Sequence, residues 1–258
     1  VKFRVERDVL AEAVTWVARG VPARPSVPVL AGILITADAE GSITLSAFDY
    51  EVSARITVPA DVQDAGTVLV LGRLLSDISR NLPAKPVEFS TSGNKVDVTC
   101  GSSRFSLMQM PEGDFPTLPT APEASGTIDG GAFTQAVAQV AIAADRGDTL
   151  PILTGVRVEI DGDKMTLLAT DRYRLAMREL HWNPAATDAN QVLLVPGRTL
   201  LDTAKSLGTT GSIDLAFGGA AGGDGLVGFE AGQRRSTTRL LDGEYPKVSS
   251  IFPTSSET

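Results

Sequence analysis

Two segments of the chain, one near its start and one near its middle, carry apolar residues at the three-to-four-residue spacing of an amphipathic helix. The first covers residues 8–19 and the second covers residues 132–144. Their apolar positions are Leu10, Val14 and Val17 in the first segment, and Phe133, Val137, Val140 and Ala144 in the second. The same spacing predicts two further helices, at 71–82 and 196–207.

Alternation of apolar and polar residues, with a glycine-containing turn in the middle, predicts two hairpins. Segments 32–36 and 43–47 flank Glu40-Gly41, and segments 155–160 and 165–169 flank Asp161-Gly162. Additional strands are predicted at 87–90, 95–100 and 104–108, and again at 212–217, 226–230 and 236–241.

These elements follow one another in the same order twice, which predicts a duplicated domain. Each half has a helix, a Pro-apolar-Leu stretch, a hairpin ending in an aspartate (Asp49 or Asp171), a second helix and more strands. Each half closes on an acidic–aromatic–proline motif, Asp114-Phe-Pro116 or Glu244-Tyr-Pro246. We therefore expect an α+β chain with domains at 1–120 and 127–253, joined by a linker at 121–126. The tail at 253–258 resembles the start of another linker.

The composition is that of a globular protein and limits the possible partners. The 258 residues are 43% hydrophobic and 21% charged, and the net charge of −8 excludes a uniformly basic surface. A single cysteine, Cys100, cannot form an internal disulfide and is predicted to be a buried strand residue in a reducing, cytoplasmic setting. We expect no signal peptide and no membrane span.

No constellation of catalytic or metal-binding residues is evident. His181 is the only histidine, so a soft metal site is not expected, and we interpret this residue as surface or packing. The glycine tract 218–225 lacks a following Gly-Lys-Ser/Thr and is predicted to be a hairpin loop. Asp49 and Asp171 occupy equivalent positions, which favours a structural turn. A hydrolase that uses both aspartates is the weaker alternative.

The second helix of each half carries a basic–acidic–basic pattern outside its apolar stripe. The three polar positions are Arg73, Asp77 and Arg80 in the first half, and Arg198, Asp202 and Lys205 in the second. One such pattern is explained by a solvated helix face with a weak ion pair. Its recurrence in register also fits a surface that meets a periodic polyanion, so nucleic acid is a candidate partner.

Several segments together resemble one family. They are Arg24-Pro-Ser-Val-Pro-Val-Leu30, Ser103-Arg-Phe-Ser-Leu107, Asp114-Phe-Pro116, Ala169-Thr-Asp-Arg-Tyr-Arg-Leu-Ala176 and Leu241-Asp-Gly-Glu-Tyr-Pro246. In this combination they are similar to the bacterial DNA polymerase III beta subunit, the sliding clamp. The Ala- and Val-rich composition resembles that of actinobacterial members. The resemblance covers essentially the whole chain.

The resemblance implies tandem DNA-clamp domains, each with two helices packed on antiparallel sheet. It implies a non-catalytic processivity factor without cofactor or metal, which forms a head-to-tail homodimer ring around duplex DNA in the full-length protein. The expected partners are the replicative polymerase subunit, the clamp loader and repair proteins, which bind through short linear motifs. From the resemblance we expect this chain to carry two of the family's three clamp domains, with the third absent.

The resemblance also implies two sets of site residues. The expected DNA contacts are Arg24, Arg73, Arg80, Arg146, Arg198 and Lys205. The expected peptide-binding residues are Leu153, Thr170, Arg172, Tyr173, Arg174, Leu175, Pro246, Ser250 and Ile251. Arg172, Tyr173 and Ser250 depart from residues that other members carry, so they affect the peptide preference of the groove. A peptide-binding adaptor that recruits partners without encircling DNA is the alternative function.

Overall fold

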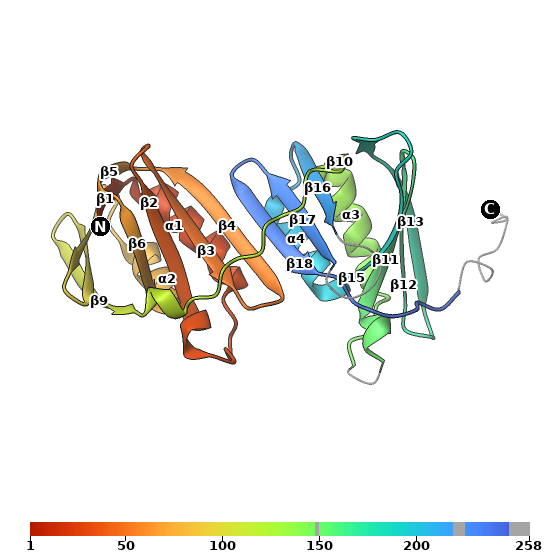
Figure 1. The fold of residues 1–258 in the computed structure, drawn as a ribbon, viewed down its shortest axis with the longest axis horizontal. Coiled ribbons are helices and arrows are strands. Elements are labelled where there is room, and N and C mark those ends of the chain that lie inside the picture. Colours follow the sequence, from red (N-terminus) through yellow and green to blue (C-terminus); the bar gives the residue numbers. More distant parts are fainter. Residues whose placement is uncertain (148–149, 219–224, 248–258) are drawn as a thin grey trace. The chain divides into compact units, whose positions relative to one another are not determined.

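The computed structural model describes residues 1–147, 150–218 and 225–247. By its internal contacts the chain divides into two compact units (Figure 1). The first comprises Val1–Pro122 and Gly228–Thr238, and the second comprises Glu123–Val227 and the residues from Arg239 onward. The predicted boundaries at 120 and 127 follow the sequence repeat rather than contacts, so they remain a prediction.

The first unit is built on a run of antiparallel strands. The strands are β1 (Lys2–Val5), β2 (Gly32–Asp38), β3 (Ser42–Phe48), β4 (Val52–Pro59), β5 (Asp61–Asp64), β6 (Gly66–Leu71), β7 (Val87–Ser92), β8 (Lys95–Cys100), β9 (Ser103–Met110) and β18 (Arg234–Arg239). Strand β17 (Leu226–Ala231) comes directly before β18 in the chain. Their order in the sheet is β18-β4-β3-β2-β6-β9-β8-β7-β1-β5. Gly228–Thr238 groups with this unit because β18 pairs with β4.

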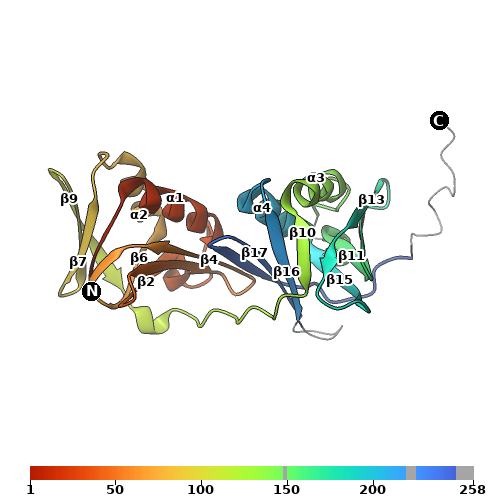
Figure 2. The same cartoon turned by 90° about the horizontal axis from the view of Figure 1, so that it is seen from above.

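Two helices pack on each other over this sheet, because each has one apolar face to bury. They are α1 (Arg7–Val17) and α2 (Gly72–Asn81), and Figure 2 shows both on the same face of the strands. Leu10, Val14 and Val17 of α1 are completely buried. On α2, Leu75 and Ile78 are buried, whereas Leu74 is 43% exposed, so the predicted apolar stripe of α2 is only partly covered.

The second unit repeats this plan with shorter sheets. Its strands are β10 (Gly126–Asp129), β11 (Gly155–Asp161), β12 (Lys164–Thr170), β13 (Leu175–His181), β14 (Asn183–Pro184), β15 (Asn190–Pro196) and β16 (Ser212–Gly218). The orders are β13-β12-β11-β15 and β14-β10-β16. Helix α3 (Gly130–Ala141) packs on α4 (Gly197–Leu207) and on β12 and β13. The side chain of Asp129 accepts the N–H of Ala132 (2.8 Å) and caps α3.

The predicted fold class is confirmed: both units combine two helices with antiparallel sheet. The two predicted hairpins are β2–β3 and β11–β12, paired antiparallel as expected. Cys100 is buried in β8, as predicted. Residues 219–224 of the glycine tract and the predicted tail linker at 253–258 lie outside the described residues.

Candidate functional site

The two equivalent aspartates hold tight turns at the ends of β3 and β12. Asp171 Oδ1 accepts the backbone N–H groups of Tyr173 (3.0 Å) and Arg174 (2.8 Å). Asp49 Oδ1 accepts those of Glu51 (3.0 Å) and Val52 (2.7 Å) in the same way. Both carboxylates therefore act as local turn residues, which confirms the structural interpretation of the repeated aspartate.

The turn that follows β12 is fixed by an unusual backbone conformation and by Thr170. Arg172 has a φ of 79°, in the left-handed region that non-glycine residues rarely adopt. Thr170 Oγ1 donates to the carbonyl of Arg174 (2.7 Å) and accepts the N–H of Arg172 (3.2 Å). These contacts compensate a conformation that costs on the order of 1–3 kcal/mol. They leave the side chains of Arg172, Tyr173 and Arg174 exposed.

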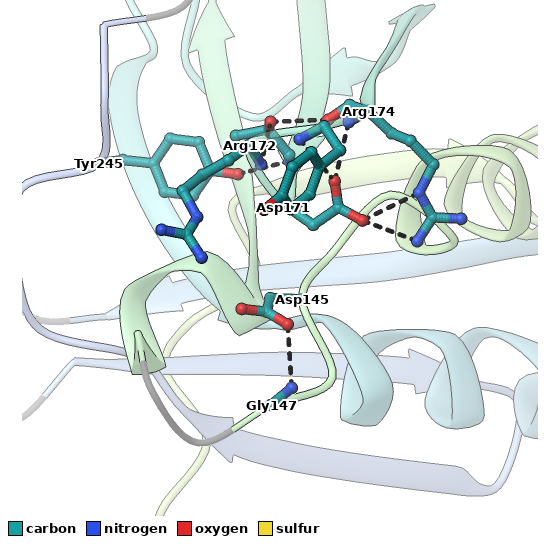
Figure 3. A network of polar contacts seen from close by, with 8 residues as sticks. Asp145, Gly147, Asp171, Arg172, Arg174 and Tyr245 are labelled. Atoms are coloured by element: carbon teal, nitrogen blue, oxygen red, sulfur yellow. Dashed lines mark hydrogen bonds and ion pairs between the residues drawn. The ribbon is translucent and has the colours of Figure 1, made fainter.

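Asp171 also binds the side chain of Arg174 (Figure 3). Its Oδ2 lies 2.9 Å from Nε and 2.8 Å from Nη2 of the guanidinium. Hydrogen bonds from the backbone and the side chain of Arg174 hold the pKa of the Asp171 carboxyl below its usual value. The carboxylate therefore stays ionised and orients an arginine at the surface of the turn.

Tyr245 anchors this turn from behind. Its hydroxyl accepts the backbone N–H of Thr170 at 2.9 Å, and both residues are 6% exposed (Figure 3). Burial raises the pKa of the Tyr245 phenol above its ordinary value, because the charged form loses hydration. Tyr245 lies in the acidic–aromatic–proline motif that closes the second repeat, but sequence reasoning did not assign it to the site. The exchange of phenylalanine for tyrosine between the two copies of that motif was the available signal.

An apolar cluster lies directly beside the turn. Its buried members are Leu153, Leu168, Leu194 and Tyr245. Partly buried hydrophobic residues pack around them, namely Leu150, Ile152, Leu175 and Leu241. We call these eight residues the second-copy cluster. The structure thus brings together Leu153, Thr170 and Leu175 of the predicted peptide-binding set, with Tyr173 at 88% exposure on the rim.

The remaining predicted peptide-binding residues divide into two groups. Pro246 follows Tyr245 in the chain and is exposed. Ser250 and Ile251 lie outside the described residues.

The predicted DNA contacts are all exposed to solvent. Arg73 and Arg80 lie on α2, and Arg198 and Lys205 lie on α4, each on the side of its helix away from the buried residues. Arg198 Nε is 4.0 Å from Asp202 Oδ2, and these side chains are 96% and 71% exposed. Such a pair contributes little to stability, so the charge on α4 remains available to a ligand.

Arg24 and Arg146 lie on loops that follow the first helix of each copy. Arg146 sits in a turn in which Asp145 Oδ1 accepts the N–H of Gly147 (3.0 Å; Figure 3). The N–H of Asp145 in turn donates to the carbonyl of Leu153 (2.8 Å). This turn therefore connects the loop of Arg146 to the second-copy cluster through one backbone contact.

Other chemistry finds little support in the part of the chain that the structure describes. There, no group of three or more His, Cys, Asp or Glu side chains is arranged to hold a metal ion. His181 is exposed and lies 3.6 Å from Asp163 at the surface. Within residues 1–147, 150–218 and 225–247, which the structure describes, no helix is both long enough and apolar enough to cross a membrane.

The two units, each with two helices packed on antiparallel sheet, have the fold of the DNA-clamp class of α+β proteins. The sliding clamp of Bacillus subtilis matches with a TM-score of 0.92 at 27% identity, over 99% of this chain and 68% of that one. A sliding clamp of Pseudomonas aeruginosa bound to griselimycin matches with a TM-score of 0.89 at 26% identity, over 98% of this chain and 68% of that one.

Sequence comparison identifies the family. The N-terminal domain of the DNA polymerase III beta subunit matches residues 1–119, and its central domain matches residues 127–247. The beta sliding clamp of Streptomyces coelicolor is 58% identical over 253 residues, which is 98% of this chain and 67% of that protein. That of Micrococcus luteus is 56% identical over 255 residues, which is 99% of this chain and 81% of that protein. The chain belongs to the DNA polymerase III beta subunit family, the bacterial sliding clamps.

Proposed function

We propose that this chain forms part of a ring that encircles duplex DNA and tethers the replicative polymerase to it, without catalysing a reaction itself. The observation that carries the proposal is the pair of matched cationic faces on α2 and α4. Each face presents two exposed cations at the same helical spacing. Both faces lie on one chain whose net charge is −8, so its positive charge is concentrated locally. Cations on both second helices attract the phosphate backbone without reading bases, which permits sliding.

The second-copy cluster and its turn support the recruitment of partner proteins. Leu175, which is partly buried and packs against the cluster that contains buried Leu153, offers apolar surface for an aliphatic or aromatic anchor of a linear motif, and Arg174 is held at the rim by Asp171. We infer that the polymerase, the clamp loader and repair proteins share this groove. A peptide-binding adaptor that does not encircle DNA would use the same groove, so the two functions differ in their DNA contacts.

An exposed strand edge supports assembly of a head-to-tail homodimer by the full-length protein. Within the described residues, β9 pairs with β8 along 103–108 but with β6 only at Gln109 and Met110. Phe105 and Met108 on this strand are 39% and 58% exposed. An unpaired strand edge with apolar side chains is a template for pairing with another chain. We propose that the edge of β9 meets a domain of the partner protomer.

The salt dependence of duplex-DNA binding tests the cationic faces. Each phosphate that the protein neutralises contributes about −0.9 to the slope of log affinity against log salt concentration. Changing Arg73, Arg80, Arg198 and Lys205 to glutamine should therefore flatten the slope by roughly 3–4. The matched control removes four exposed cations from strands, namely Lys2, Lys95, Arg104 and Arg178. An equal loss of slope in the control would show that binding follows net charge alone and would refute the assignment.

Topology distinguishes the clamp from the adaptor. The longer protein, with all its domains, should remain on closed circular DNA after loading and should slide off when the circle is linearised. Equal retention on both forms, with unchanged affinity for a partner peptide, would favour the adaptor.

A further inference from the structure

The first unit contains an apolar cluster that shares equivalent positions with the second-copy cluster, among them Leu30 with Leu153, Leu69 with Leu194 and Phe115 with Tyr245. Its buried members are Val29, Leu30, Phe48, Leu69 and Phe115, and the partly buried residues that pack on it are Leu34, Met110 and Leu118. We call these residues the first-copy cluster. Leu30 belongs to the 3₁₀ turn Pro28–Ala31, and Leu153 belongs to the equivalent turn Pro151–Thr154.

The backbones around the two clusters agree closely. A Cβ added to Gly32 would lie 2.6 Å from Leu69 Cδ1, and one added to Gly155 would lie 2.6 Å from Leu194 Cδ1. The left-handed residue of the neighbouring turn is Tyr50 in the first copy, with a φ of 76°, and Arg172 in the second. The two clusters are therefore the same structural site in two copies of one domain.

One side chain distinguishes the first-copy cluster from its counterpart. Phe48 ends β3 where Thr170 ends β12, and its ring is 6% exposed within the cluster. This ring lies 5.7 Å from that of Tyr50, centroid to centroid, at an angle of 58°. An aromatic side chain of the protein thus occupies space beside Leu30 and Leu69 at the position where the second copy has a small polar residue.

The segment just after the closing motif of the first repeat supplies another occupant. Leu118 follows Phe115 by three residues and packs against the first-copy cluster from the segment that leads out of the first repeat. A segment tethered this closely has an effective concentration on the order of mM. A free peptide of low affinity cannot compete with it at ordinary concentrations. Leu118 thus packs on the first-copy cluster as an aliphatic anchor of a linear motif would pack on the second-copy cluster.

We propose that the first copy contains a latent peptide-binding site, closed by Phe48 and occupied by the chain's own Leu118. The ligand class is a linear peptide with leucine and phenylalanine anchors, as for the groove of the second copy, so this inference rests on the proposed function of that groove. It explains how a duplicated domain presents one such groove rather than two. Removal of Leu118, together with replacement of Phe48 by the threonine of the second copy, should open the site.

Methyl NMR of the chain tests the proposal with one probe. The probe is a synthetic peptide with adjacent leucine and phenylalanine residues and a nitroxide label. In the F48T/L118A variant, the methyl signals of Leu30 and Leu69 should lose intensity on addition of the probe. In the wild type they should not. The matched control is L74A, which truncates a leucine that is 43% exposed on α2, and it should behave as the wild type.

The outcomes separate this inference from the proposed function. The methyl signals of Leu153 and Leu194 report on the second-copy groove in every sample, so their failure to respond counts against that groove alone. Unchanged Leu30 and Leu69 signals in F48T/L118A at saturating probe would overturn the latent site. A response of these signals in the wild type would equally overturn it, because the site would then be open. If the double variant does not fold, L118A alone should give a weaker loss of intensity in the Leu30 methyl signal on addition of the probe. No loss of intensity in L118A would then overturn the latent site.

Discussion

Replacing Tyr245 with phenylalanine removes a single oxygen atom from behind the turn that follows β12. The hydroxyl accepts the backbone N–H of Thr170 at 2.9 Å, in a place where both residues are 6% exposed. Phenylalanine keeps the ring and its packing against Leu153 and Leu168 but leaves that N–H without this acceptor. A buried donor that loses its partner costs about 1–3 kcal/mol. We expect Y245F to lower the free energy of unfolding by an amount in this range.

Amide hydrogen exchange and urea denaturation measure this effect separately. Because about 1–3 kcal/mol is a factor of roughly 5–150 in an equilibrium constant, the Thr170 amide should exchange faster by a factor in this range in Y245F. The midpoint of urea unfolding should fall for the second unit. The matched control is Y173F, which removes the same hydroxyl from a side chain that is 88% exposed and should change stability by less than about 0.5 kcal/mol. Equal midpoints for Y245F and wild type, with unchanged Thr170 exchange, would refute the reasoning.

The pH dependence of the same pair gives an additional check. Burial holds the pKa of the Tyr245 phenol above its ordinary value of 10.0, so the unfolded chain ionises first as the pH rises. The stability that the neutral phenol contributes is complete below pH 10.0 and is lost as the pH rises through the folded-state pKa. The stability difference between wild type and Y245F should therefore shrink in alkaline solution. A constant difference would show that the hydroxyl is not buried.

Two other substitutions test contacts in the second unit. D171N keeps an oxygen acceptor for the turn but removes the charge that binds Arg174. Because the pKa of Asp171 is lowered from 3.8, the stability that its carboxylate contributes is present above that pH and is lost as the pH falls through the folded-state pKa. The urea midpoints of wild type and D171N should therefore differ at neutral pH and converge in acid. G126A places a Cβ against the carbonyl oxygen of Asn183 and should destabilise the second unit by about 1–3 kcal/mol in urea denaturation, whereas G113A, where a Cβ meets nothing within 4 Å, should leave the midpoint unchanged. Convergence at neutral pH would contradict the first, and equal midpoints of the two alanine variants would contradict the second.

The sequence determined the duplicated α+β plan because the signals involved are local. Helical spacing at Leu10, Val14 and Val17 and a glycine turn between alternating segments depend only on neighbours in the chain. The repeated aspartate was also interpreted correctly, since its turn is closed by backbone groups two and three residues away. Exposure of the cations on α2 and α4 followed from the same helical geometry.

Tertiary structure decided the elements whose local signals were weak or misleading. β13 (Leu175–His181) contains helix-favouring Ala, Met, Arg, Glu and Leu residues, and it becomes a strand because it pairs along its whole length with β12. β15 (Asn190–Pro196) is a short apolar run whose periodicity alone cannot assign it, and its pairing with β11 does. Burial of Leu75 beside exposed Leu74 likewise depends on which face α2 turns to α1.

The candidate peptide site shows the same division. The family resemblance indicated Leu153, Thr170 and Leu175, but their meeting with Tyr245 joins residues 70 to 92 positions apart, a contact that no spacing rule predicts. The repeat placed Phe48 and Thr170 at equivalent positions. Only the tertiary structure shows that Phe48 is buried in a cluster with Leu30 and Leu69, because the space that a side chain occupies is set by neighbours distant in the sequence.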